Sequence, residues 1–235
     1  DTRQTKKIMN KFNISNKLIS FNKNNSLIKI PKIIKDLKEG KSIAIVSDAG
    51  MPGICDPGED IARCLKCEGI DVICIPGACA AITALVSSGL PSSSFVFEGF
   101  LPKKQIDREK ILLEISKNEK TTIVYESPKR LRKLLKQLFE FCGGDREIMV
   151  ARELTKKFEE HVGNNINEVI EFFSGKDIIG EITIVVKGIK ERDINYDKFI
   201  IKKDLDDLIK AGLSLSAASK YLSLIHISEP TRQSL

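Results

Sequence analysis

The sequence contains no tryptophan, and only three tyrosines and two histidines in 235 residues. So few aromatic side chains leave no aromatic-rich signature of an RNA-recognition module. The two histidines, His161 and His226, do not complete a Cys/His zinc site. No apolar run approaches the roughly 20 residues that span a bilayer, and no signal peptide is recognisable, so we expect a cytoplasmic protein without a membrane partner.

Two common nucleotide-binding motifs are also missing. Neither G-x-x-x-x-G-K-[ST] nor G-x-G-x-x-G occurs, which argues against a P-loop and against a dinucleotide fingerprint. Six cysteines are present, and Cys64 and Cys67 have C-x-x-C spacing, but no second pair accompanies them. Packing of small apolar thiols is therefore favoured over redox or metal chemistry, and we predict no metal site.

The composition itself is that of a globular protein. With 42% hydrophobic residues the chain can form one large domain or two modest ones. Lysine and arginine number 38 against 32 acidic residues, which gives a formal charge of +6. This balance suits a polyanionic partner such as RNA, and it equally suits an ordinary solvated surface.

The first half alternates between strand-like and helix-like segments. KSIAIVS, residues 41–47, and IDVICIPG, residues 70–77, read as buried strands. A helix over residues 56–69 is expected with Asp56 as its N-cap, and a second helix follows over residues 78–89. Repeated strand, loop and helix units favour an α/β domain with a parallel sheet.

The second half is also mixed α/β. FVFEGF, TTIVYES, IMVAREL and EITIVVKG read as strands, with helices starting near Asp107, after Ser127 and at INEVIEFFSG. The helix after Ser127 carries a leucine stripe, and we assign that stripe to the core. A polar linker over residues 188–198 precedes two short helices joined by a glycine-containing turn.

Both ends of the sequence depart from this style. DTRQTKK starts the chain with no strand before it, so we expect a fragment; LSLIHISEPTR resembles a translated sequencing adaptor. Four parts are expected: a first α/β domain over residues 1–94, a second α/β domain over 95–190, a linker with the start of a helical module over 191–221, and an adaptor-derived tail over 222–235.

The loop SDAGMPGICDPG, residues 47–58, follows the first expected strand, and Pro76-Gly77 ends the second. In an open α/β sheet, ligands bind beyond the carboxyl ends of strands, so the two loops should converge. Glycines let backbone approach a ligand closely, and Asp48 offers a carboxylate to ribose-type hydroxyls or a cation. A tight turn with a helix cap is the alternative, but residues 48–53 are longer than a cap requires.

Six motifs together carry a resemblance to a known family. VSDAGMPGICDPG, IPGACAAITALVSSGLP, FEGFLP, YESPKRL, ARELTKKFEE and GEITIVVKG occur in this order. In order and spacing they resemble the bacterial small-subunit ribosomal RNA methyltransferase I family of the tetrapyrrole methylase superfamily. The resemblance covers essentially residues 1–221.

The resemblance implies two α/β domains, with S-adenosyl-L-methionine held in a cleft between them, and it is compatible with assembly as a homodimer. It also implies 2′-O-methylation of a cytidine in the decoding region of 16S rRNA in the small ribosomal subunit. Carried over by similarity, the cofactor-binding residues are Asp48, Ala49, Gly50, Met51, Pro76, Gly77, Cys79, Ala80, Tyr125, Gly180 and Glu181.

The sequence departs from the family at both ends and in one loop, and at the C-terminal end the family's helical module is cut. Family members usually have a preceding strand and a T-P-I-G-N-L loop, about forty residues that this chain does not contain. In FNKNNS, Asn22 and Asn24 stand where the family's H-x-H-N pattern has histidines, and only Asn25 matches. A role of this loop in RNA binding or catalysis is therefore not carried over.

Charged residues supply the remaining site candidates. Glu153 and Lys156, beside Arg152, are our hypothesis for the catalytic polar groups near the acceptor; a solvated charged turn is the alternative. RNA contacts should be electrostatic, although any single surface lysine can also simply be solvated. The RNA-binding candidates are Lys103, Lys104, Arg108, Lys129, Arg130, Lys133 and Lys136.

Two other functions remain open at this point. One is methylation of a small molecule such as a tetrapyrrole; YESPKRL, ARELTK and the basic balance argue against it. The other is a truncated domain that binds nucleoside or RNA without turnover. A substrate test separates the first from RNA methylation, and a cofactor titration tests the second.

Overall fold

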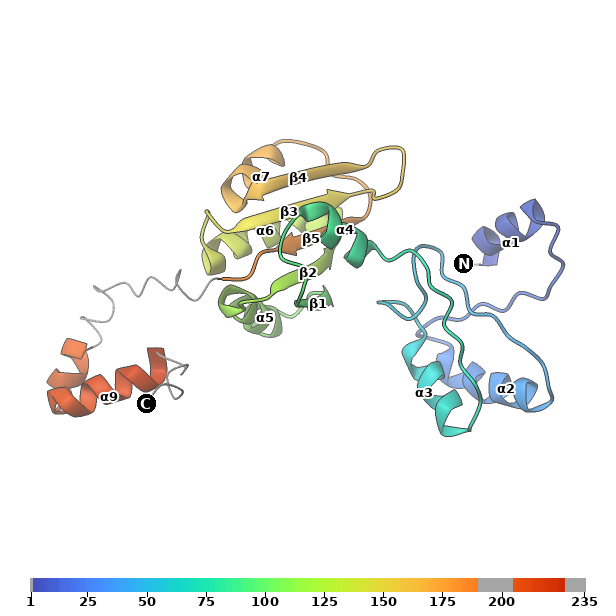
Figure 1. Cartoon of the computed structure of the whole chain (residues 1–235), viewed down its shortest axis with the longest axis horizontal. Helices are drawn as coiled ribbons and strands as arrows, with labels where there is room; N and C mark the ends of the chain where they lie inside the picture. The colour runs from blue at the N-terminus through green and yellow to red at the C-terminus, as the bar shows by residue number, and fades with distance from the viewer. Residues whose placement is uncertain (1, 190–204, 227–235) are drawn as a thin grey trace. The chain divides into compact units, whose positions relative to one another are not determined.

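The computed structural model describes residues 2–189 and 205–226 (Figure 1). The chain divides into two compact units, residues 1–188 and 189–235. The first unit carries all the residues predicted to bind cofactor or RNA, and the second is helical where it is described.

A five-stranded mixed sheet forms the centre of the first unit. Its strands are β1 (Phe95–Phe100), β2 (Thr121–Glu126), β3 (Glu147–Arg152), β4 (Glu160–Asn165) and β5 (Ile182–Val186). They lie in the order β1-β2-β5-β3-β4, with β1 and β2 parallel and the other neighbours antiparallel. All five residues of β5 are buried, as its continuous apolar run predicts. The four strands predicted in this half are confirmed.

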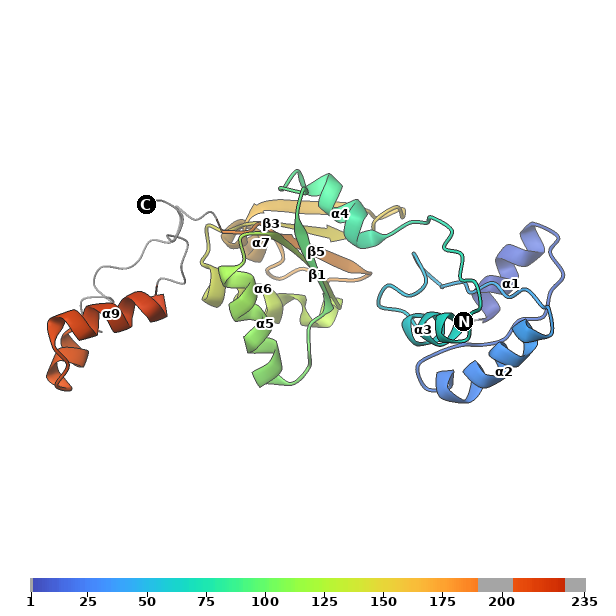
Figure 2. The ribbon, with the colours of Figure 1, turned by 60° about the horizontal axis from the view of Figure 1, so that its bottom comes forward.

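Helices cover both faces of this sheet (Figure 2). In β3, Ile148 and Val150 pack in the core formed with α5 (Gln105–Lys117), α6 (Pro128–Cys142) and α7 (Ile166–Phe172). Their neighbours Met149 and Ala151 pack instead with α4 (Ala80–Ser88). This alternation follows from the two-residue period of a strand. The predicted leucine stripe of α6 is confirmed as core: Leu131, Leu134, Leu135 and Leu138 are buried.

The N-terminal part has a smaller core of its own. Its helices are α1 (Thr2–Lys11), α2 (Ser26–Lys38) and α3 (Glu59–Cys67), and Ile30, Ile33, Ile61 and Leu65 form one cluster between α2 and α3. The helix predicted over residues 56–69 is thus present but shorter. Asp56 is not its N-cap, because Gly58 occupies that position and the Asp56 carboxylate accepts a hydrogen bond from Ser47 Oγ at 2.5 Å.

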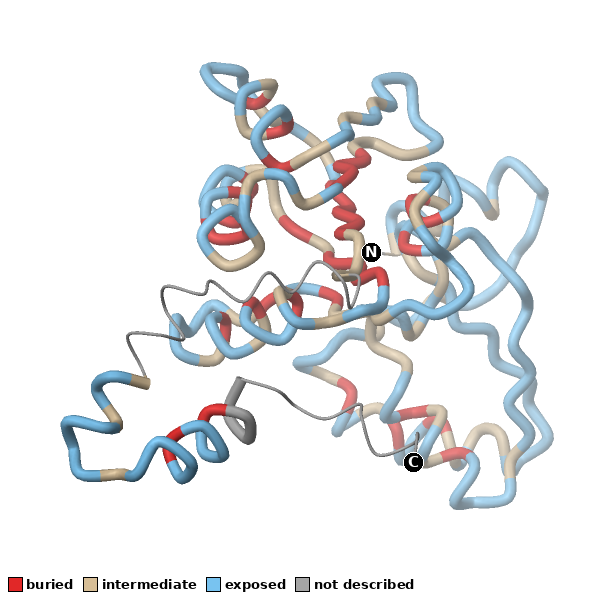
Figure 3. The backbone as a smooth tube through the Cα atoms, turned by 60° about the vertical axis from the view of Figure 1, so that its left-hand side comes forward, coloured by how far each residue is buried: buried red, intermediate tan, exposed pale blue. Residues whose placement is uncertain are grey.

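The strands predicted over residues 41–47 and 70–77 are not formed. Both segments are irregular and largely exposed, and Figure 3 draws exposed backbone in pale blue. Ile73 is 82% exposed and Val46 60%. Residues 42–46 and 71–78 take part in no backbone–backbone hydrogen bond among the described residues. A β-branched run becomes a strand only when a neighbour satisfies its peptide groups, so the parallel sheet predicted for this half is absent from the described chain.

The helical expectation for the C-terminal part is confirmed. A helix over residues 205–210 and α9 (Leu215–His226) flank a turn at Gly212, whose φ of +97° lies in the region that favours glycine. The helix α9 continues past the predicted start of the tail at residue 222, and residues 227–235 lie outside the described part. So does most of the linker predicted over 188–198. None of the described helices has the length and apolarity needed to cross a bilayer.

A buried charge network joins β2 to the helices on one face. The Glu126 side chain is fully buried, and its carboxylate lies 3.2 Å from Arg108 Nη2 and 2.6 Å from Arg130 Nη2. Arg108 Nε also donates to Gln137 Oε1 at 2.7 Å, which connects α5 with α6. Arg108 was predicted to contact RNA; this is wrong, because its guanidinium is buried and already bound.

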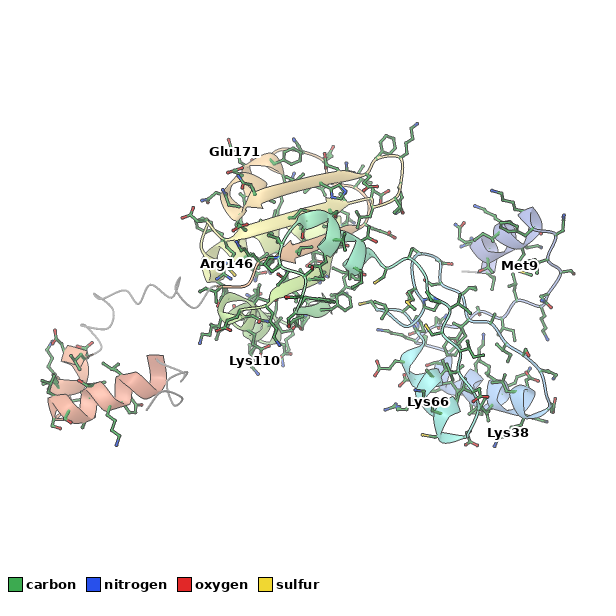
Figure 4. The ribbon with its side chains drawn as sticks, viewed as in Figure 1. Met9, Lys38, Lys66, Lys110, Arg146 and Glu171 are labelled. Carbon is green, nitrogen blue, oxygen red and sulfur yellow. The ribbon has the colours of Figure 1, made fainter. Side chains whose placement is uncertain are left out.

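Breaking this network should destabilise the fold. Arg108→Met leaves Glu126 buried with only Arg130 beside it, and we expect a loss of about 3 kcal/mol in the free energy of unfolding. Urea unfolding followed by circular dichroism measures the change. Lys110→Met is the control, because Lys110 is exposed on α5 and points away from the sheet (Figure 4). Equal midpoints for the two variants would contradict the prediction.

Candidate functional site

The predicted site residues of the second half gather at one end of the sheet, which is called the site edge from here on. Strands β2 and β3 are both antiparallel to β5, so they run in the same direction and both terminate at this end. The register pairs Thr183 with both Tyr125 and Ala151. Tyr125, the end of β3 and the residues before β5 are therefore within two strand spacings of one another, about 10 Å.

Tyr125 connects this edge to α4. Its hydroxyl oxygen accepts a hydrogen bond from the backbone N–H of Ala81 at 3.1 Å, at the start of that helix. The N-cap residue Cys79 makes no side-chain capping bond, so the phenol supplies an acceptor for one of the helix's free N–H groups. The ring makes edge contacts with Phe97 and Phe100, at centroid distances of 5.0 and 5.6 Å. Burial raises the pKa of Tyr125 to about 12, so the hydroxyl stays protonated at neutral pH.

The two glycine-containing loops approach each other as predicted. Gly50 has a φ of +72°, and a Cβ built on it would lie 3.4 Å from the carbonyl oxygen of Ala78. A second close approach joins the first loop to β1: a Cβ on Gly99 would lie 2.8 Å from Cys55 Sγ, so a side chain there would displace the thiol, and the φ of +62° at Gly99 also favours glycine. Burial raises the pKa of the Cys55 thiol. Cys55 lies in the motif VSDAGMPGICDPG and Gly99 in FEGFLP, but the sequence pattern gave neither residue a role of its own.

These loops offer the chemistry that a nucleoside-like ligand needs. Asp48 contributes a carboxylate, and the exposed turn over residues 76–78 contributes backbone groups that make no backbone–backbone hydrogen bond in the described structure. Ser47 Oγ donates to Asp56 and accepts from Ala49 N–H, which orders the start of the first loop. Two surface hollows, of about 320 and 410 Å³, lie elsewhere, and residues 2–36 line them.

Glu153 and Lys156 form an ion-paired turn at the end of β3. Glu153 Oε1 accepts from Lys156 Nζ and from the backbone N–H of Glu181, both at 2.8 Å. Lys156 Nζ also lies 3.0 Å from Glu181 Oε2. Gly180, with a φ of +99°, packs directly against the Glu153 side chain, and a Cβ there would overlap it. The structure thus brings together four predicted site residues: Glu153, Lys156, Gly180 and Glu181.

The ionisation of this pair follows from its contacts. The hydrogen bond from Lys156, with that from the Glu181 N–H, lowers the pKa of Glu153. The same carboxylate, together with Glu181, raises the pKa of Lys156. Both groups are therefore charged at neutral pH, and the Glu153 pairing is lost only as the pH falls through its lowered pKa. In this ion pair, Lys156 is suited to orient a bound polar group, whereas Glu153 with its lowered pKa is a poor acceptor for a proton.

The predicted RNA-binding lysines lie at the start of α5 and along α6. Lys103, Lys104, Lys129, Lys133 and Lys136 are exposed. Lys104 pairs with Asp107 at 3.7 Å, and Lys133 Nζ lies 3.5 Å from Gln105 Oε1. Arg130 is partly buried and committed to Glu126. Their exposure permits contact with a phosphate backbone, and their role in RNA binding stays a prediction.

All six cysteines are free thiols. Within residues 2–189 and 205–226, no group of three His, Cys, Asp or Glu side chains is arranged to hold a metal ion. Cys79 remains of interest through its position as the N-cap of α4 beside Tyr125.

Comparison with known proteins finds relatives that are described as methyltransferases or methylases. A profile of the family described as Tetrapyrrole (Corrin/Porphyrin) Methylases matches residues 5–170. Two relatives are called ribosomal RNA small subunit methyltransferase I. The Thermotoga maritima protein is 44% identical over 80% of this chain and 84% of its own length. The Bacillus subtilis protein is 40% identical over 94% of this chain and 77% of its own length.

Solved structures agree at the level of the fold. The crystal structure of the methyltransferase CobJ matches with a TM-score of 0.53 and 18% identity, over 74% of each chain. At this identity the likeness concerns the fold alone. The α/β fold predicted from the sequence is confirmed.

The contact between Tyr125 and α4 can be tested by removing one atom. Tyr125→Phe keeps the ring among Phe97 and Phe100 but leaves the Ala81 N–H without its acceptor. We expect a loss of about 1 kcal/mol in the free energy of unfolding, with faster amide hydrogen exchange at the start of α4. Tyr221→Phe, at an exposed tyrosine of the other unit, is the control. Unchanged exchange at Ala81 in Tyr125→Phe would contradict this assignment.

Proposed function

The chain belongs to the tetrapyrrole methylase family and, within it, to the small-subunit ribosomal RNA methyltransferase I group, and from this we propose the reaction that it performs. The proposed reaction transfers a methyl group from S-adenosyl-L-methionine to the ribose 2′-oxygen of a cytidine in the decoding region of 16S rRNA. The observation that carries it is the 44% identity to a relative bearing that group's name, over 80% of the chain.

The cofactor, in this proposal, is held by the two adjacent loops and the site edge. Asp48 would accept hydrogen bonds from ribose hydroxyls, and the backbone of Gly77 and its neighbours would contact the base. The approach of Gly50 to Ala78 supports a common binding place for both loops. Ala49, Met51, Pro76, Cys79 and Ala80 complete the proposed contacts from the loops, and Gly180 and Glu181 those from the site edge.

When bound, the cofactor supplies a methyl group already activated by its sulfonium. The protein must then hold the ribose oxygen in line with that methyl group and receive the hydroxyl proton. Tyr125 contributes by fixing the Cys79–Ala81 turn through its hydroxyl, while Phe97 and Phe100 hold its ring. Tyrosine is ordinarily neutral near pH 7, and with its pKa raised to about 12 Tyr125 stays a neutral phenol at higher pH as well.

Glu153 and Lys156 are proposed to act on the acceptor. In the ion pair, Lys156 presents an ammonium that can orient the ribose or a neighbouring phosphate, and Glu153 holds Lys156 in place. The proton could pass to Glu153 once Lys156 has turned toward the substrate, because the carboxylate is then relieved of the hydrogen bond that lowers its pKa. Exposed lysines on α5 and α6 would bind the phosphates.

Labelled methyl transfer tests the function directly. The chain is incubated with labelled S-adenosyl-L-methionine and small ribosomal subunits that lack the modification. We expect label on a ribose 2′-oxygen of a cytidine in 16S rRNA. Label on a tetrapyrrole but not on RNA would replace this proposal with small-molecule methylation. Cofactor binding with no transfer to either acceptor would make the chain a binding fragment.

The role of Glu153 can be separated from that of the turn. Glu153→Gln keeps the hydrogen-bonding shape but removes the charge, so we expect transfer to slow about tenfold or more while cofactor affinity changes less than about twofold. Steady-state kinetics and a cofactor titration measure the two effects. Because the pKa of Glu153 is lowered, the wild-type contribution should persist as the pH falls from neutral into the range where glutamate ordinarily titrates, and be lost only as the pH falls through the lowered pKa.

The control for this variant is Glu159→Gln. Glu159 lies on the same turn, and its carboxylate accepts from the Thr155 N–H and contacts His161. A similar loss of transfer in both variants would attribute the effect to the order of the turn. Normal turnover of Glu153→Gln would remove Glu153 from the mechanism.

A further inference from the structure

The loop that joins β3 and β4 presents an aromatic side chain that neither the core nor the proposed cofactor contacts use. We propose that Phe158, with Lys157 beside it, is a stacking platform for an unpaired RNA base. This inference rests on the proposed function, because it takes RNA as the substrate class. It adds a binding site to the lysines of α5 and α6, and the chemistry recognised is a single-stranded nucleotide: a base face and the adjacent phosphate.

The loop is ordered by its own hydrogen bonds. The Thr155 N–H donates to Glu159 Oε2 at 2.7 Å, and the Glu159 N–H donates to the Lys156 carbonyl at 3.2 Å. The Lys156 N–H donates in turn to the Glu153 carbonyl at 3.0 Å. Thr155 adopts a φ of +63°, which a non-glycine residue rarely holds without surrounding contacts. The position of Phe158 is thus set by the loop before any ligand arrives.

Phe158 is nevertheless 66% exposed. A phenylalanine of the core, such as Phe173 at 3% exposure, removes its ring from water, and that burial stabilises the fold. The ring of Phe158 gains little from folding. An ordered loop that holds an aromatic ring in water has the form of a binding surface, since binding would add burial that folding does not.

The charges around the ring favour an anionic partner. Every carboxylate of the loop is engaged: Glu153 with Lys156, Glu159 with His161, and Glu160 with Arg152. Lys157 has no ion pair among the described residues, and its Nζ lies 5.5 Å from the centroid of the Phe158 ring. Because this ammonium lies over one face of the exposed ring, the other face is open to a nucleotide base, while the adjacent phosphate takes the cation.

The location is consistent with a role in holding the acceptor strand. Figure 1 shows the β3–β4 loop extending beyond the ends of these strands. The loop leaves β3 at Arg152, at the site edge, where Tyr125 is the next-to-last residue of β2 and where Glu153 pairs with Lys156. A base stacked on Phe158 would therefore anchor the RNA on the side of the sheet where the proposed transfer takes place.

Binding of a short, mixed-sequence, fluorescent single-stranded RNA to the full chain tests this site. Phe158→Ala and Phe158→Leu both remove the ring face, and only the second keeps a large apolar side chain. We expect each to raise the Kd about fivefold or more, whereas Phe158→Tyr stays within about twofold of the wild type. Phe139→Ala, which removes another exposed aromatic on α6, is the matched control and should leave the Kd unchanged.

Two further measurements identify the chemistry. Fully paired RNA of the same sequence offers no free base face, so its binding should not respond to Phe158→Ala. Lys157→Gln should reduce the salt dependence of single-strand binding by about one phosphate contact, a change of about 0.7 in the slope of log K against log salt. Circular dichroism melting of each variant checks that the fold is retained.

Several results would overturn the inference. The inference is wrong if wild type and Phe158→Ala bind single-stranded RNA with equal affinity. It is also wrong if the wild type binds no RNA. A Phe158→Ala effect seen only in sedimentation, as reduced self-association, would assign the ring to contact with a second copy. Methyl transfer distinguishes the two proposals. If Phe158→Ala labels 16S rRNA normally and binds RNA with unchanged affinity, the stacking platform is refuted and the proposed function stands. If RNA binding depends on Phe158 but the label appears on another acceptor, the proposed function is refuted and the RNA-binding role of Phe158 stands.

Discussion

The buried carboxylate of Glu126 is the constraint on which the arrangement of the site depends. A charge without access to water is tolerated only when cations and hydrogen-bond donors surround it, and Arg108, Arg130 and the Ser127 N–H do so here. These contacts fix α5 and α6 on one face of β2. The preceding residue, Tyr125, holds the start of α4 with its hydroxyl. Two consecutive residues of one strand thus tie helices to the sheet.

Close backbone approach is the second element of the site. Gly50 meets the Ala78 carbonyl, Gly99 meets the Cys55 sulfur, and Gly180 meets the Glu153 side chain. In each case a glycine with positive φ leaves space that a side chain would fill. The motifs at these positions therefore encode contacts between segments that are distant in the sequence. Apart from Tyr125, the predicted cofactor and catalytic residues accordingly lie either in the two adjacent loops or at the ion-paired turn.

Much of the second half could be predicted from the sequence because its signals are local. Ser127 and Pro128 mark the start of α6, its leucine spacing marks the buried side, and apolar runs mark β2, β3 and β5. The rest depended on tertiary partners. β4 has Val162 as its one large aliphatic residue and lies at the sheet edge, so no pattern indicated it. Arg108 is buried because α6 and β2 pack against it, and the segments 41–47 and 70–77 are not strands because, in the described chain, no neighbouring strand pairs with them. Both outcomes depend on tertiary contacts, which local sequence patterns do not indicate.

The exposed aliphatic segments have a consequence for the behaviour of the chain in solution. Residues 43–46 and 72–75 combine β-branched side chains with backbone groups outside any sheet, and Ile75 is 77% exposed. Such segments are templates for strand addition between molecules. Two such stretches lie directly beside the proposed cofactor loops, so a ligand bound there would lie next to the segments through which strands of two molecules can pair.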